Sequence, residues 1–432
     1  MNSTTIVVVT ATLFGWGLIS QRMARTDLTA PIVFIVVGAL LAWTGLVAGP
    51  EESAALTPLV EVTLVWVLFS DAARLPLGEL RHDVGRFVRL LGVGLPLTVV
   101  FGWALSAWLW PGLGLWLALF VGAALAPTDA ALGLPVVTNP RVPSRIRQLL
   151  TVESGLNDGI ATPIVMVAIA GAAAAAGLES HEGAGPAVVQ LALGVVIGCV
   201  VGALGGWLLR MFRRRNLAAD DFAGIAVLAL ALLSYGAALV LDGNGFVAAF
   251  CGGLAFGATA GRRAPQELVF LEQVGELLSV LVWLAFGALA MPIMLDWIDA
   301  RMLLYAVLSL TLVRMLPVAL ALMRSGTRRR TVLFVGWFGP RGLASLVFAL
   351  LALEALGPVA GEAVAIIALT VLLSVLAHGL SATPLSARYG AAEAAAGPEP
   401  GGPVDVITLR PGAASRRVGP GRNEQSAGMS HG

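Results

Sequence analysis

The sequence contains no lysine, only two cysteines and few charged residues. All 27 of its basic residues are arginines, and Asp, Glu, Lys and Arg together make up 12% of 432 residues. A soluble chain of this length needs about twice that charged fraction, so the composition excludes an ordinary soluble protein. Without lysine there is neither a catalytic amine nor the GxxxxGK[ST] loop that binds nucleotide phosphates, so we expect no nucleotide partner and no ATP-driven pumping.

The two cysteines, Cys199 and Cys251, both lie inside apolar runs. We therefore expect no disulfide framework and interpret both as small buried hydrophobic residues. No group of His, Cys and Asp has the spacing of a metal-ligand or nucleophile cluster, which argues against a membrane enzyme and predicts no cofactor. The net charge of +1 gives no reason to expect nucleic-acid binding.

Apolar residues are abundant instead, at 58% of the chain with a mean hydropathy of +0.87. Many runs reach the roughly 20 residues that a helix needs to cross about 30 Å of hydrocarbon, and they lack the alternation of a membrane barrel. The sequence therefore predicts an all-α polytopic membrane protein in a lipid bilayer. About thirteen transmembrane helices are expected, at residues 4–21, 31–49, 55–73, 88–110, 113–138, 146–171, 186–209, 222–241, 244–261, 268–291, 301–323, 331–353 and 358–384.

Arginine divides the predicted connections into two sets. The odd-numbered connections and the C-terminal segment hold 24 arginines, whereas the even-numbered connections hold only Arg301. Arginine collects on the cytoplasmic side of plasma-membrane proteins, so we expect the N-terminus outside and the C-terminus in the cytoplasm. Residues 386–432 are rich in Ala, Gly, Pro, Ser and Arg, which predicts a disordered cytoplasmic tail.

Two predicted spans carry a proline within two residues of a charge, in Ala126-Pro127-Thr128-Asp129 and Gly339-Pro340-Arg341-Gly342. Proline removes a backbone donor, and a charge in a span is costly, so the pairs predict two helices that break and cross at mid-membrane. Their positions near either end of the chain suggest an inverted repeat. An acid would suit the N-termini of the half-helices and a base their C-termini. Two ordinary proline kinks are the alternative.

The sixth span contains Glu153-Ser154-Gly155-Leu156-Asn157-Asp158. Ser154 and Asp158 are four residues apart and share a helix face, where they offer hard oxygen ligands to an alkali cation. Burial favours the protonated form of a carboxylate, so a proton and a cation could compete for Asp158. We expect Glu153 to pair with Arg341, because each charge would otherwise be isolated. A purely structural polar network is the alternative.

These motifs together resemble the monovalent cation:proton antiporters of the sodium/proton exchanger type, over residues 5–385. The resemblance implies exchange of Na⁺ or Li⁺ for H⁺ by a homodimer through alternating access. It implies that the cation lies among Thr128, Asp129, Ser154 and Asp158, near the Glu153–Arg341 pair. Asn157, which we also count among the residues that bind the cation or proton, precedes Asp158 and implies electroneutral exchange. Asp71 occupies a position near the ion path. Relatives have a proline after the first Asp, where this chain has Ala130.

The resemblance also implies a division of residues 1–385. Dimerisation helices are expected at about 4–73 and 186–261, core helices at about 88–171 and 301–384, and a linking helix at about 268–291. A K⁺/H⁺ exchanger or a cation channel on the same scaffold is the alternative function. A membrane sensor or scaffold would need a larger soluble output region than the C-terminal segment provides.

Four further charges within or near spans remain open. Glu272 and Glu276, one helical turn apart, could line an ion entry path or face headgroups. Arg314 could form a structural pair with an acid such as Glu61, or serve the function. His378 is likewise compatible with a structural or a functional role.

Overall fold

The computed structural model describes residues 3–23, 29–45, 57–75, 84–129, 132–178, 184–261 and 264–396. Within these ranges the chain forms helices and no strand, as the apolar runs predict. Ala130, the charged residues of several predicted connections and residues 397–432 lie outside the described residues.

The helices of the first half of the chain follow the predicted spans, with the first break between α6 and α7. They are α1 (Ser3–Met23), α2 (Ala30–Trp43), α3 (Thr57–Ala73), α4 (Val84–Arg89), the π-helix η3 (Leu90–Gly94), α5 (Leu95–Leu109), the 3₁₀-helix η4 (Pro111–Leu113), α6 (Gly114–Ala124), α7 (Leu134–Val137) and α8 (Ser144–Ala175). The π turn precedes Pro96, which has no N–H for a regular helical bond.

The second half contains the second break, between α15 and α16. Its helices are α9 (Ala184–Arg214), α10 (Asp220–Val240), α11 (Gly245–Thr259), α12 (Ala264–Trp297), α13 (Ala300–Leu310), α14 (Leu312–Ala321), α15 (Arg329–Trp337), α16 (Leu343–Leu356), the 3₁₀-helix η5 (Gly357–Ala360) and α17 (Gly361–Ala396).

Eight helical segments among the described residues are long and apolar enough to cross a membrane, and three shorter apolar helices accompany them. Two details differ from the prediction. The predicted span 301–323 divides at Thr311, less than two turns before Pro317. Helix α17 continues to Ala396, so the predicted start of a disordered tail at 386 is wrong, and its remainder lies outside the described residues.

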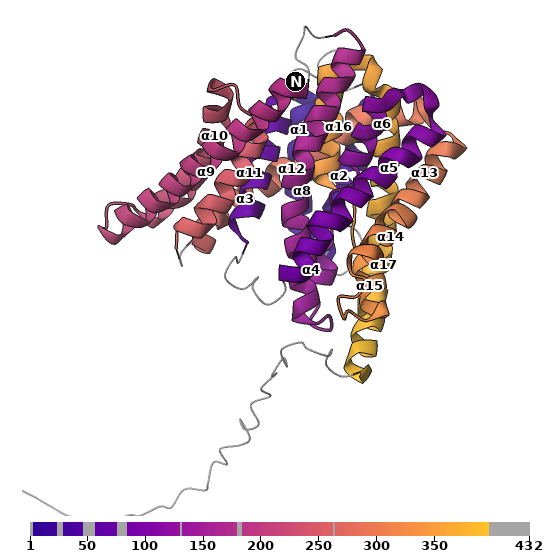
Figure 1. Ribbon diagram of the computed structural model, residues 1–432. Helices are drawn as coiled ribbons and strands as arrows, with labels where there is room; N and C mark the ends of the chain where they lie inside the picture. The colour runs from indigo at the N-terminus through magenta and orange to yellow at the C-terminus, as the bar shows by residue number, and fades with distance from the viewer. Residues whose placement is uncertain are drawn as a thin grey trace, which may run out of the picture.

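The helices pack in two groups. Helices α1, α2, α3, α9, α10 and α11 pack on one another and on α12, whereas α5, α6, α8 and α13 to α17 form the other group. Figure 1 shows α9, α10 and α11 on one side and α13 to α15 on the other, with α8 and α12 between them. Helices α3 and α11 reach across to α8, which carries Asp158, so the predicted site lies where the groups meet.

Small residues let α9 and α11 approach closely. Gly194, Gly198 and Gly202 recur every four residues along α9, and a Cβ at any of them would overlap the backbone of α11 or of Asn244, which caps it. This spacing is typical of tightly packed helices in membranes. Both cysteines are free; Cys199 is exposed on α9, so its interpretation as a buried residue is wrong.

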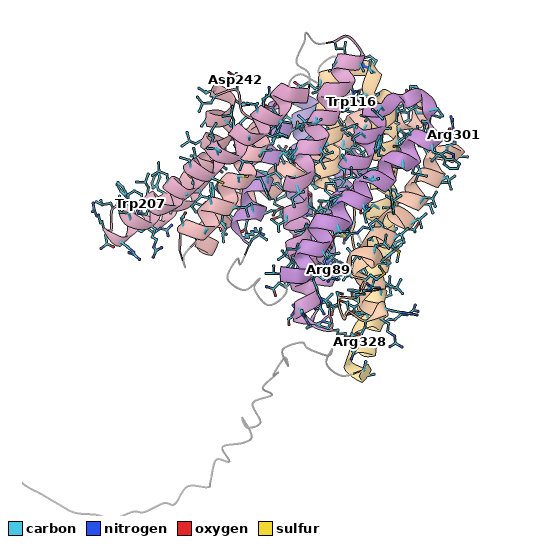
Figure 2. All side chains as sticks on the ribbon, viewed as in Figure 1. Arg89, Trp116, Trp207, Asp242, Arg301 and Arg328 are labelled. Atoms are coloured by element: carbon cyan, nitrogen blue, oxygen red, sulfur yellow. The ribbon has the colours of Figure 1, made fainter. Side chains whose placement is uncertain are left out.

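Charged residues from the two predicted sets of connections lie toward opposite ends of the molecule. Arg89 and Arg328 lie toward one end, and Asp242 and Arg301 toward the other (Figure 2). These four residues therefore lie at the two ends as the alternation of the predicted connections expects.

Candidate functional site

The two broken segments cross and bond to each other through their backbones. The Asp129 N–H donates to the Pro340 carbonyl oxygen at 2.8 Å. The Ser345 hydroxyl of α16 donates to the carbonyl of Ala124, the last residue of α6, at 2.6 Å. Broken helices leave end carbonyls and N–H groups without helical partners, and here each break supplies partners to the other.

Asp129 caps the second break. Its Oδ2 accepts the N–H of Leu343, the first residue of α16, at 3.0 Å, and its Oδ1 accepts the Leu132 N–H at 3.4 Å. A carboxylate at this end of α16 offsets the positive end of the helix dipole. A Cβ at Gly342 would overlap the Asp129 carboxylate, so this contact requires glycine.

Arg341 performs the opposite task for the first break. Its side chain has no solvent-exposed surface, and its Nη1 donates to the carbonyl oxygens of Ala126 and Pro127, the latter at 3.0 Å. These carbonyls follow the C-terminal end of α6, where a cation is favourable. Acid and base therefore occupy the ends that the sequence predicts for them.

A hydroxyl and amide cluster joins the first break to α8. Thr128 Oγ1 lies 3.0 Å from Ser154 Oγ, and Asn157 Nδ2 donates to Thr128 Oγ1 at 2.7 Å. All three side chains are buried. The structure therefore brings together three of the predicted cation-binding residues, from the break and from one face of α8.

Asp158 follows Asn157 directly on α8 and is 8% exposed. Its Oδ1 is buried and accepts no hydrogen bond among the described residues. The carboxylates of Asp71 and Asp129 are near enough to act on it electrostatically. A carboxyl group that is buried among like charges is stable only when its own charge is neutralised, either by a proton or by a bound cation. A site that exchanges a proton for a cation needs such a group.

Two glycines bring the other group of helices against α8 around Asp158. The backbone of Asp71 on α3 lies 3.6 Å from where a Cβ of Gly155 would be, and the Phe250 ring of α11 fills the space that a Cβ of Gly159 would need. Asp158 therefore lies on α8 at the contact between the two groups of helices.

The predicted pairing of Glu153 with Arg341 is wrong. Glu153 Oε1 lies 2.6 Å from Nη2 of Arg314 on α14, and both side chains are nearly fully buried. Arg341 instead directs its guanidinium to the carbonyls of the first break. The sequence marks Arg314 as a charge within a span, but it does not show that the turn at Thr311 directs α14 toward α8.

Asp71 is linked to further charged side chains near the C-terminal end of α3. Arg74 interacts electrostatically with Asp71 and forms an ion pair with Glu272 of α12. Glu276, one turn further along α12, is exposed. Of the two glutamates that the sequence leaves open, only Glu272 is connected to the site by these contacts.

The chain resembles known proteins along most of its length. The family described as "Sodium/hydrogen exchanger, transmembrane" matches residues 8–388. A probable Na⁺/H⁺ antiporter of Schizosaccharomyces pombe is 26% identical over 374 residues, 78% of this chain and 48% of its own length. The K⁺/H⁺ antiporter NhaP2 of a Shewanella species is 26% identical over 373 residues, 85% of this chain and 63% of its own length. The chain thus spans about half to two thirds of these relatives.

A solved structure shares the fold. The sodium proton antiporter MjNhaP1 from Methanocaldococcus jannaschii, at pH 8, superposes with a TM-score of 0.71 at 19% identity. The match covers 89% of this chain and 98% of that one. At this identity the likeness establishes the arrangement of the helices.

Proposed function

Because the chain belongs to the sodium/hydrogen exchanger family of transmembrane proteins, we propose that it is a secondary antiporter that exchanges Na⁺ or Li⁺ for H⁺. The observation that carries the proposal is Asp158, a buried carboxylate whose Oδ1 has no hydrogen-bond partner in the part of the chain that the structure describes. It follows Asn157 directly on α8, and Asn157 belongs to the cluster that joins α8 to the first broken helix. The family consists of transporters, so no enzymatic step is proposed.

The cation would bind to Asp158 Oδ1 together with oxygens of Thr128, Ser154 and Asp129. These are hard ligands of the kind that alkali cations prefer. Proton and cation would exclude each other, because either one neutralises the carboxylate and removes the attraction for the second. Asn157 supplies an amide where a second carboxylate would add a charge, which favours one-for-one, electroneutral exchange.

Transport requires Asp158 to face each side in turn. We propose that the group of helices containing α8 moves against the group containing α3 and α11, in a homodimer assembled through the latter group. The proposed organisation has about thirteen membrane crossings and an inverted repeat. In the plasma membrane, its N-terminus would lie outside and its C-terminus in the cytoplasm. The alternation of arginine between connections supports this topology.

Exchange of K⁺ for H⁺ is the second candidate. Several relatives of similar identity carry the name K⁺/H⁺ antiporter, and the oxygen ligands around Asp158 suit either alkali ion. A third candidate, a cation channel, would let the cation flow without a counter-transported proton.

Proteoliposomes with an entrapped pH-sensitive dye distinguish the three. Added Na⁺, Li⁺ or K⁺ should each be tested with and without an imposed membrane potential. The proposal expects saturable, potential-independent proton movement with Na⁺ and Li⁺. Movement with K⁺ alone would favour the second candidate, and cation flux without proton movement would reject antiport.

A further inference from the structure

His378 on α17 is a buried titratable residue that the ion site does not use. It is 2% exposed, and its ring stacks on Trp337 with centroids 5.1 Å apart. Its Nε2 lies 2.8 Å from the carbonyl oxygen of Trp337, the last residue of α15. One side of the second break is therefore attached to α17 by this imidazole.

Ser374, one turn earlier on α17, holds the other side of the same break. Its Oγ accepts the backbone N–H of Arg341 at 2.7 Å and lies 3.2 Å from His378 Nδ1. Ser374 and His378 thus bond to the two ends of the segment between Trp337 and Arg341. Because α17 is a continuous helix here, it fixes the separation of these ends.

Both ring nitrogens of His378 contact backbone carbonyls. Nε2 lies 2.8 Å from the Trp337 carbonyl oxygen, and Nδ1 lies 2.8 Å from the carbonyl oxygen of Ser374 as well as 3.2 Å from its hydroxyl. A carbonyl oxygen only accepts, so the ring donates to each carbonyl through whichever nitrogen carries a hydrogen. The contact with Trp337 is the one that links α17 to α15, because Ser374 lies one turn away on the same helix as His378.

We infer that Ser374 and His378 form a clamp across the second broken helix that positions Arg341, and through Arg341 the cation ligands on the first break. Arg341 connects the two breaks, because its backbone is bonded to Ser374 and its side chain to the carbonyls of Ala126 and Pro127. Thr128 follows Pro127 directly and belongs to the hydroxyl cluster. His378 and Ser374 are positioning residues, since neither touches the proposed cation site.

The effect of the clamp on transport rests on the proposed antiport. The test therefore includes one measurement that does not depend on transport. Hydrogen–deuterium exchange of peptides covering 337–343 reports on the clamp directly, because Ser374 holds the Arg341 amide. We expect Ser374→Ala and His378→Phe to accelerate exchange in this segment. The matched control is Thr370→Val, one turn earlier on α17, whose buried hydroxyl bonds to the Ile366 carbonyl of its own helix. It should leave exchange unchanged.

The second measurement is the apparent KM for the transported cation in proteoliposomes. Loss of one hydrogen bond in the clamp should raise the KM about three- to tenfold with little change in maximal rate, whereas Thr370→Val should stay within about twofold. The double variant should be no worse than the more affected single variant, because both residues act on one segment. His378→Gln, which keeps a donor toward Trp337, should recover part of the KM.

Each combination of results decides one part of the inference. Faster exchange at 337–343 with a raised KM supports both the clamp and its positioning role. Unchanged exchange in both variants overturns the clamp, and faster exchange with a wild-type KM overturns its positioning role. If the wild-type protein moves no proton with any cation, the proposed antiport and the positioning role fail together, while the exchange measurement still decides the clamp.

Discussion

Glu153 on α8 and Arg314 on α14 form an ion pair, with 2.6 Å between Oε1 and Nη2, at 3% and 2% exposure of the two residues. The pair ties the helix that carries Asp158 to α14, which packs on α15 beside the second break. Arg314 also packs against Gly339, where a Cβ would overlap its guanidinium. The pair therefore connects α8 with both α14 and the second broken segment.

Breaking this pair should destabilise the protein strongly. Glu153→Gln leaves Arg314 as an isolated buried charge, at a cost of about 3–5 kcal/mol. Thermal unfolding in detergent should show a marked decrease in Tm for Glu153→Gln and for Arg314→Met. The double variant should lose less than the sum. Arg301→Gln, which breaks the exposed pair with Asp299, is the control and should cost about 1 kcal/mol or less. Equal losses in both pairs would contradict the structure.

Gly342→Ala should disrupt the crossing of the breaks. The added methyl group would overlap the Asp129 carboxylate that caps α16, so either the cap or the backbone must move. We expect both a lower Tm and a loss of transport. Gly236→Ala on α10 has open space around its Cβ and should be neutral or slightly stabilising. A wild-type phenotype for Gly342→Ala would refute the contact between Asp129 and α16.

Removing the central hydroxyl should weaken cation binding. Thr128→Val removes the acceptor of Asn157 Nδ2 and a proposed cation ligand, so the apparent KM for the cation should rise about tenfold. Thr63→Val removes a buried hydroxyl that bonds to the Leu59 carbonyl of its own helix and serves as the control. The prediction fails if the two variants have the same KM.

The two glutamates of α12 should behave differently. Glu272→Gln removes the ion-pair partner of Arg74, whose positive charge also acts on Asp71. For the transported cation entering from the side of the membrane on which Glu272 lies, the apparent KM should rise about two- to threefold at low ionic strength, and less at high salt. Glu276→Gln should have no effect. The measurement is cation uptake by inside-out and right-side-out vesicles. Equal effects of the two substitutions would show that Glu272 does not line the ion path.

Much of this architecture follows from short-range rules. Apolar run length predicts the helices, and the proline near Asp129 or Arg341 predicts the breaks, because both act within one or two turns. The partner of Glu153 could not be predicted in this way. Arg314 and Arg341 are both buried charges in spans, and the choice between them depends on the bend at Thr311 and on the approach of α14 to α8.

The clamp residues show the same limit. Ser374 and His378 are one turn apart in an apolar helix, a spacing that many structural polar pairs share. Their relation to Trp337 and Arg341 becomes visible only when α17 lies beside the second break. The four-residue spacing predicts that Ser154 and Asp158 share a face of α8, and only the family resemblance places Thr128 near them. The hydrogen bond from Asn157 to Thr128 required the fold.

Antiport through this site requires a proton and an alkali cation to compete for Asp158. The most direct test is the apparent KM for Na⁺ in proteoliposomes as a function of pH, for the wild type and for Asp158→Asn. Competition for one carboxylate predicts that the KM rises about tenfold for each unit of pH decrease on the acid side, with a constant maximal rate, and that Asp158→Asn inserts into the membrane but does not exchange. A KM independent of pH, or Na⁺-dependent proton movement by Asp158→Asn, would contradict it.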